Sequence, residues 1–333
     1  MAKAKSQPQA QVSARARRSA READAERRNR LLIIGGVLAV VIIAVGFIAF
    51  GWYQTHIRPY GTVVLRVEDS EFTLGHLVRR MELEYDQTPL SSQGAIFLQL
   101  PDIVLDRFET EGKLLAHAHE LNDITVTGEE VAAEIRERGN LAQDAAESAY
   151  ADEVRRQVEE SGLKRGEYEQ MLRAQLLEEK VSAYFTFVGP TVEPQVRARA
   201  MVFDDEARAN EALMRLAAGE DFAALAIELS LSGQTIDVDW STKGTSELIP
   251  TSIEDFLFES QPGARSELVE SGNYFYIAEL LERDDARALS DSQRTAVGTR
   301  ELTKWLSGLS VTDYERNLSD ENRNRALNDV FDA

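Results

Sequence analysis

The sequence contains no cysteine, and this absence excludes several kinds of chemistry. Disulfide bridges, thiolate nucleophiles and cysteine-based zinc sites are all impossible in this chain of 333 residues. Histidine is also scarce, because the chain has only His56, His76, His117 and His119. His117 and His119 lie two positions apart on a predicted helix, so they point to different sides of it and do not share one ion. With no glycine-rich phosphate loop and no HExxH motif, the sequence predicts neither a cofactor nor a metal ion.

Basic residues are unevenly distributed. Residues 1–30 hold nine Lys and Arg against three Asp and Glu, whereas the whole chain has a net charge of -20, so the remainder carries -26. This acidic body argues against nucleic acid as a partner, because phosphate contacts require a basic surface. The first 30 residues also have almost no large apolar side chain, and we expect them to form a disordered basic tail in the cytoplasm.

Residues 31–53 contain no charged side chain. As a helix, this run is long enough to cross a bilayer, which requires about 20 apolar residues. Trp52 and Tyr53 stand at its end, where an interfacial aromatic belt is expected, and the preceding basic residues place residues 54–333 outside the cytoplasm. The sequence thus predicts a single-pass protein of the cell membrane, with residues 31–53 in the lipid bilayer. A cleaved signal peptide is the alternative, but both the basic and the apolar segments are long for one.

Residues 58–190 show a mostly helical pattern after one short strand at 62–67. Thr127 and Glu130 form a capping box at the start of one predicted helix. Apolar side chains then recur at every fourth position between Tyr168 and Phe185, which is typical of an amphipathic helix. Because this region contains no catalytic constellation, we expect either a helical spacer or a cradle whose apolar faces hold an unfolded peptide.

Residues 191–286 show a different pattern, in which strands alternate with helices. We expect the order β-α-α-β-α-β, with the following bounds: a strand at 196–203, helices at 205–218 and 222–229, a strand at 237–240, a short helix ending at 258 and a strand at 274–281. Residues 287–333 are expected to form a C-terminal helical segment that packs on the first helical region, and Ser290 and Gln293 form a capping box at its start. The predicted fold class is therefore α+β with an antiparallel sheet.

Several pieces of this central stretch resemble the parvulin class of peptidyl-prolyl cis-trans isomerases. The most specific is Ala-Gly-Glu-Asp-Phe-Ala-Ala-Leu-Ala at 218–226, supported by 196–199, 247–250, 261–263 and 281–283. Residues 62–185 are similar in plan to the N-terminal region of membrane-anchored or periplasmic foldases of the PrsA, SurA and PpiD kind, including Ile-Thr-Val-Thr-Gly-Glu-Glu-Val at 124–131. The resemblance implies an extracytoplasmic folding factor that binds unfolded or proline-containing polypeptides. It also implies a SurA-like helical chaperone region at 58–190 and a parvulin-like domain at 191–286.

The resemblance also implies a site and shows where this chain departs from the class. The two histidines that parvulins usually carry on the first and last strands are replaced by Ala200 and Tyr276, and Ser232 takes the position of an acid or a thiol. Ser232 and Tyr276 are therefore the candidate catalytic donors. The alternative is that Tyr276 packs in the core and Ser232 is a solvated loop residue. An apolar proline pocket is expected from four substrate-binding side chains: Val238, Leu248, Ile253 and Phe258.

Rotation about an X-Pro bond crosses a barrier of about 18–20 kcal/mol without covalent chemistry. An apolar pocket and polarising groups that prefer the twisted amide can therefore accelerate it. Three hypotheses follow for this chain. It is a foldase with residual isomerase activity, a non-enzymatic chaperone with a degenerate parvulin domain, or a membrane scaffold for a fixed partner.

Overall fold

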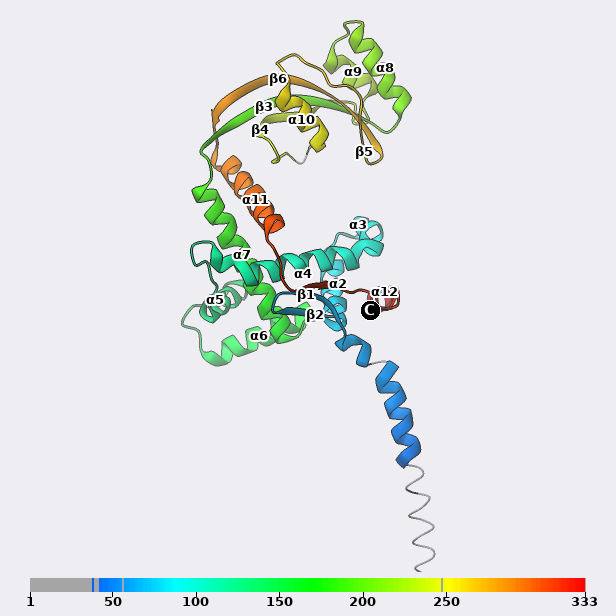
Figure 1. Cartoon of the computed structure of the whole chain (residues 1–333), viewed down its shortest axis with the longest axis vertical. Helices are drawn as coiled ribbons and strands as arrows, with labels where there is room; N and C mark the ends of the chain where they lie inside the picture. Colours follow the sequence, from blue (N-terminus) through cyan, green and yellow to red (C-terminus); the bar gives the residue numbers. More distant parts are fainter. Residues whose placement is uncertain (1–37, 39–41, 56, 247, 333) are drawn as a thin grey trace, which may run out of the picture.

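The computed structural model describes residues 38, 42–55, 57–246 and 248–332 (Figure 1). Residues 42–55 form a helix that leads into the body of the protein. Among the described residues, no helix combines the length and the apolarity that a bilayer crossing requires. The predicted basic tail and the first part of the predicted membrane span, residues 31–37 and 39–41, lie outside the described residues.

A mostly helical module occupies the lower part of Figure 1 and is built from both ends of the chain. Its N-terminal elements are η1 (Arg58–Gly61), β1 (Val63–Val67), β2 (Ser70–Thr73), α2 (Leu74–Gln87), α3 (Leu90–Ile96), η2 (Phe97–Gln99), α4 (Leu100–His117), η3 (Ala118–Glu120), α5 (Gly128–Arg138), α6 (Glu147–Ser161) and α7 (Arg165–Val188). Its C-terminal elements are α11 (Asp291–Gly308), β7 (Tyr314–Arg316) and α12 (Asp320–Asp332).

A small antiparallel sheet of order β2-β1-β7 joins the two ends of the chain. Strand β7 pairs with β1 through Leu65 and Arg316, and helix α12 adds Ala326, Leu327 and Val330 to the core that β1, α2 and α4 share. The C-terminal segment therefore completes the core of the N-terminal module, because these apolar side chains are removed from water only when the two ends meet.

Side chains cap several helices in this module. Thr73 accepts a hydrogen bond from the backbone N–H of His76 at the start of α2. The predicted capping boxes are confirmed, with Thr127 and Glu130 at the start of α5 and Ser290 with Gln293 at the start of α11. Such boxes satisfy backbone N–H groups that have no partner within the helix, so they define where the helix begins.

The second module is a four-stranded antiparallel sheet with the strand order β4-β3-β6-β5. Its elements are β3 (Val192–Phe203), α8 (Glu206–Ala217), α9 (Phe222–Leu229), β4 (Ile236–Thr242), α10 (Thr251–Glu259), β5 (Val269–Ser271) and β6 (Tyr274–Ala288). The α+β class and the antiparallel pairing are confirmed, and the one strand of this module that was not predicted from the sequence is the short edge strand β5. One face of the sheet packs on α8 and α9 and the other on α10.

Helices α7 and α11 connect the two modules and lie side by side (Figure 1). The chain leaves the helical module through α7, forms the sheet module, and returns through α11. Gly298 of α11 allows a close approach, because an added Cβ would overlap the hydroxyl of Thr186 on α7. Arg300 of α11 also pairs with Glu193 of β3 at 2.8 Å, which ties the returning helix to the sheet.

Candidate binding groove and sheet face

Helix α7 has one buried face and one face that remains open. Its buried side chains include Tyr168, Leu172, Leu177 and Val181, which pack into the helical module. The opposite face carries two rows of side chains at a spacing of four residues. One row is Glu178, Ser182 and Thr186, and the other is Glu179, Ala183 and Phe187. Residues four apart are neighbours on a helix surface, so each row runs along the helix axis.

Helix α11 covers the end of the first row. Arg294 donates a hydrogen bond from Nη2 to the backbone O of Thr186 at 3.2 Å, and Gly298 packs against Ser182 and Thr186. The second row stays exposed to solvent along its whole length. Phe187 at its end has 81% of its surface exposed, and its neighbour Val188 has 52% exposed.

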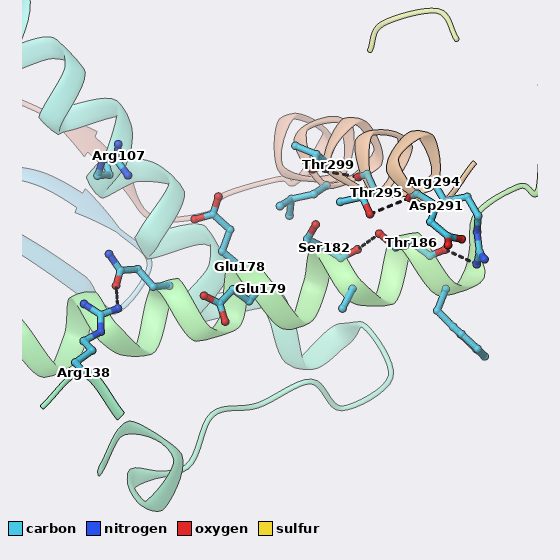
Figure 2. Close-up of a pocket in the computed structure, with 14 residues that line it drawn as sticks. Arg107, Arg138, Glu178, Glu179, Ser182, Thr186, Asp291, Arg294, Thr295 and Thr299 are labelled. Carbon is cyan, nitrogen blue, oxygen red and sulfur yellow. Dashed lines mark hydrogen bonds between the residues drawn. The ribbon is translucent and has the colours of Figure 1, made fainter. Parts of the chain in front are cut away.

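A groove of ≈ 890 Å³ lies along this face of α7 (Figure 2). Side chains of α11 line one side of it, and Arg107 of α4 and Arg138 of α5 lie toward its other end. The complete lining consists of Arg107, Arg138, Gln175, Glu178, Glu179, Ser182, Ala183, Thr186, Phe187, Asp291, Arg294, Thr295, Thr299 and Leu302. The groove therefore mixes apolar, hydroxyl and charged side chains, and it is wide enough for an extended peptide segment.

Two of the three arginines that line the groove form ion pairs, whereas Arg294 forms none among the described residues and donates only to the backbone O of Thr186. Arg107 pairs with Glu84 at 3.2 Å, and Arg138 pairs with Glu134 at 2.6 Å and with Gln175 at 2.9 Å.

The acidic side chains differ. Within the part of the chain that the structure describes, Glu178, Glu179 and Asp291 form no ion pair. The charge available to a ligand in the groove is therefore negative.

Two smaller hollows continue the groove along α7. One of ≈ 290 Å³ shares Arg107, Gln175 and Glu178 with it, and one of ≈ 670 Å³ shares Ala183 and Phe187. The second hollow adds apolar surface from Ile124 and Tyr184. Together they make a track that follows the helix for several turns, which suits an extended chain better than a compact small molecule.

On the sheet module, the strand register brings Ala200 and Tyr276 to one face. Ala200 of β3 pairs with Ala278 of β6, and Tyr276 pairs with Val202, so Ala200 and Tyr276 are diagonal neighbours. Both belong to the apolar cluster that α10 covers, in which Ala200 is fully buried and Tyr276 is half-buried. The positions where parvulins usually carry histidines are therefore adjacent here, but they present a methyl group and a phenol.

The other predicted site residues are dispersed. Ser232 lies in the exposed loop before β4 and donates its hydroxyl hydrogen bond to the backbone O of Gln234 at 3.0 Å. Val238 and Ile253 are buried in the cluster with Tyr276, Phe258 packs at its edge, and Leu248 is 56% exposed. The four predicted pocket residues thus do not share one solvent-open surface in this conformation.

Glu254 organises the loop that precedes Leu248. Its Oε2 accepts a hydrogen bond from the backbone N–H of Gly244 at 3.0 Å. Burial raises the pKa of Glu254, and the backbone hydrogen bonds from Gly244 and Ser246 act in the opposite direction. The neighbouring Ile249, which the sequence reasoning did not select, occupies the core position beside Ile253.

The residues of the groove were not predicted from the sequence. Helix α7 was predicted to be amphipathic, but only from the apolar repeat that is buried in the structure. The available signal was the second repeat, in which Glu179, Ala183 and Phe187 continue at the same spacing on the opposite side. Together with Ile124 and Tyr184 in the adjoining hollow, Phe187 forms a contiguous apolar surface, which indicates a contact site.

The protein thus consists of a helical module, which contains the groove, and a small antiparallel sheet module. Comparison with protein families indicates what the helical module resembles. Residues 24–182 match the SurA-like N-terminal domain family. The resemblance of the N-terminal region to SurA-like foldases, inferred from the sequence, is confirmed by this match.

Similar solved structures include foldases and chaperones of several bacteria. A PrsA peptidylprolyl isomerase from Bacillus anthracis is 16% identical with a TM-score of 0.41, over 69% of this chain and 96% of that one. The foldase PrsA from Streptococcus pneumoniae is 16% identical with a TM-score of 0.34, over 81% and 93%. A structure from work on two SurA-like chaperones of Campylobacter jejuni is 10% identical with a TM-score of 0.19, over 81% and 94%. None of the curated proteins matches the chain.

Proposed function

We propose that this protein is a membrane-anchored, extracytoplasmic folding factor that holds non-native polypeptide segments in the groove along α7. The observation that carries the proposal is the exposed row Glu179, Ala183 and Phe187 beside a groove of ≈ 890 Å³. Phe187 is 81% exposed, and contact of its ring with water is unfavourable. Covering the ring with an apolar segment of a client lowers the free energy and so favours binding. The match of residues 24–182 to the SurA-like N-terminal domain family supports the same function.

Membrane anchoring is supported by the uncharged run 31–53 and by its connection to the body of the protein. Arg325 of α12 donates a hydrogen bond to the backbone O of Thr55 at 3.1 Å, and Tyr60 donates to Asp329 of α12 at 2.7 Å. The C-terminal helix thus holds the segment that follows the predicted membrane helix. In the proposed arrangement the helical module lies between the membrane helix and the sheet module (Figure 1).

The test is suppression of aggregation. The full-length chain, purified in a mild detergent, is mixed with a chemically unfolded client that scatters light as it aggregates after dilution. We expect the intact chain to suppress scattering, and about ten times more of a Phe187→Ser variant to be needed for the same effect, because one aromatic contact contributes about 1.5–3 kcal/mol.

The matched control is Ile227→Ser on α9, which removes an apolar side chain outside the groove. Ile227 is 71% exposed and Phe187 is 81% exposed, so the two substitutions are comparable. The control is expected to suppress aggregation as the intact chain does. Equal suppression by all three proteins would show that the groove is not the client site. No suppression by the intact chain would refute the chaperone function itself.

A second candidate function is residual prolyl isomerase activity. The observation that favours it is the phenol of Tyr276 on the sheet face that α10 covers, beside the position of Ala200. A protease-coupled assay on a proline-containing peptide measures this activity directly. A rate above background that Tyr276→Phe abolishes would support a catalytic phenol. A rate equal to background would exclude isomerase activity and leave the chaperone function as the remaining candidate.

Leu248 tests whether the sheet module contacts proline-containing peptides. Its side chain is 56% exposed, so Leu248→Asp is expected to leave the stability of the fold unchanged. If this face binds the peptide, the substitution weakens binding by about three- to tenfold, since part of a Leu contact is lost. Met214→Asp on α8 is the control, because Met214 is 67% exposed and α8 covers the opposite face of the sheet. Equal affinities of all three proteins would exclude the Leu248 surface.

A further inference from the structure

The groove along α7 has a polarity that goes beyond a general affinity for unfolded chains. Phe187 supplies apolar surface at the end nearest the sheet module, and Glu178 with Glu179 supplies negative charge two turns earlier. Ala183 lies between them in the same row and is itself exposed, so a backbone can pass over it. The arrangement therefore has an acidic end and an aromatic end, separated by a small side chain.

The charge of the acidic end is available to a ligand. Arg107 and Arg138 line the groove toward the same end as Glu178 and Glu179, but Glu84 and Glu134 already pair with them (Figure 2). Arg294 donates to a backbone O of α7 and is turned toward the junction of α7 and α11. Glu178 and Glu179 are exposed and have no ion pair within the described ranges. Asp291, at the start of α11, lies at the other end of the groove beside Arg294 and Thr186 (Figure 2).

The spacing of the two ends selects a register in the ligand. Glu179 and Phe187 are eight positions apart, which corresponds to about 12 Å along a helix at about 1.5 Å per residue. An extended peptide advances about 3.3 Å per residue, so it covers the same distance in about four residues. A client side chain on Glu179 and another on Phe187 therefore come from positions about four apart in the client.

We infer that the groove selects extended client segments in which a Lys or Arg lies about four residues from an aromatic or large apolar side chain. Glu178 and Glu179 receive the basic group, and Phe187 receives the apolar one. This inference rests on the proposed function and adds the chemical class of the preferred client. A segment with an acidic residue at the same position meets uncompensated negative charge and binds more weakly.

The experiment measures fluorescence anisotropy of short labelled peptides with the full-length chain in detergent. The peptides share a Gly and Ser background and one Phe. They carry Lys about four residues from the Phe, Glu at that same position, or Lys directly beside the Phe. We expect the first peptide to bind about fivefold more tightly than either of the others at low salt. Raising the salt to about 1 M, where charges are screened within about 3 Å, should remove the difference.

Two sets of variants locate the effect. Glu178→Gln with Glu179→Gln is expected to abolish the preference for Lys, and Glu179→Lys is expected to reverse it in favour of the Glu peptide. The control is Glu267→Gln with Glu270→Gln, which changes the net charge equally at exposed positions of the sheet module and should keep the preference. Circular dichroism confirms that each variant is folded.

The possible outcomes separate this inference from the proposed function. Equal binding of the Lys and Glu peptides, or a preference that survives the Glu178 and Glu179 substitutions, would overturn the charge selection while leaving peptide binding intact. Equal binding of the two Lys peptides would overturn the spacing. Failure of every peptide to bind would refute the proposed function and the inference with it.

Discussion

Gly298 offers the sharpest test of how the groove is built. An added Cβ at this position would overlap the hydroxyl of Thr186 and would lie 3.0 Å from both the backbone O of Ser182 and the backbone N of Thr186. Gly298→Ala therefore pushes α11 away from α7 or forces the hydroxyl of Thr186 to rotate. Since α11 lines one side of the groove, either response changes the shape of the site.

The expected magnitude follows from two opposing terms. Overfilling a packed contact costs about 1–3 kcal/mol. Replacing Gly by Ala inside a helix stabilises by about 1 kcal/mol, because it lowers the entropy of the unfolded chain. Gly298→Ala is thus expected to lower the free energy of unfolding by about 1 kcal/mol. In a Thr186→Ala background the overlap with the hydroxyl disappears, and the same substitution is expected to be neutral or stabilising by up to about 1 kcal/mol.

Trp305 provides the signal for this test. It lies on α11 with its ring centroid 6.3 Å from that of Phe185 on α7, so its fluorescence reports on the junction during urea unfolding. Trp52 and Trp240 are replaced by Phe to remove other signals. Gly166→Ala in α7 is the control, because an added Cβ there meets no atom within 4 Å and only the gain in helix propensity remains. An equal effect of Gly298→Ala in both Thr186 backgrounds would refute the proposed contact.

Two further predictions concern buried charges. Glu279 pairs with Arg199 at 2.5 Å and with Arg265 at 2.9 Å, so Glu279→Gln is expected to lower the free energy of unfolding by about 1–3 kcal/mol in a urea titration, and an unchanged midpoint would contradict this. In the helical module, burial lowers the pKa of His76 to about 4, and burial raises the pKa of Glu111 to about 7 although Arg80 opposes it. Buried His76 is neutral, so its contribution to stability is present above its unfolded pKa of about 6.5 and is lost as the pH falls toward 4. Buried Glu111 is protonated, so its contribution is present below its unfolded pKa of about 4.5 and is lost as the pH rises toward 7. Between about pH 4.5 and 6.5 the two groups change the free energy of unfolding in opposite directions. The stability of His76→Leu should therefore fall with rising pH, and that of Glu111→Gln should rise. Parallel curves of unfolding free energy against pH for both variants and the parent would refute these roles of His76 and Glu111.

Features encoded by neighbouring residues could be predicted from the sequence. The capping boxes of Thr127 with Glu130 and of Ser290 with Gln293 form where the pattern placed them, because each depends on residues three positions apart. The order of strands and helices between β3 and β6 was likewise accessible, since period and turn residues are local signals.

Features that depend on contacts distant in sequence could not be predicted. Strand β7 is only Tyr-Glu-Arg, all exposed, and it exists because it pairs with β1 some 250 positions earlier. Gly298 gives no local sign that its missing side chain admits α11 against Thr186. Leu248 and Ile249 are both apolar in a loop without periodicity, so the sequence does not show that Ile249 is buried and Leu248 exposed.

The packing of α7 against α11 connects the groove to the sheet module. Gln293 of α11 donates to the backbone O of Trp240 at 2.6 Å and to Oε1 of Gln195 at 2.9 Å, while Arg300 holds Glu193. The same helix lines the groove with Asp291, Thr295 and Thr299. Because these contacts join α11 to both strands, a displacement of α11 away from α7 either breaks them or moves β3 and β4 with the helix. If the proposed groove binds a client in this way, binding is expected to alter the sheet module, although the two do not share a lining residue.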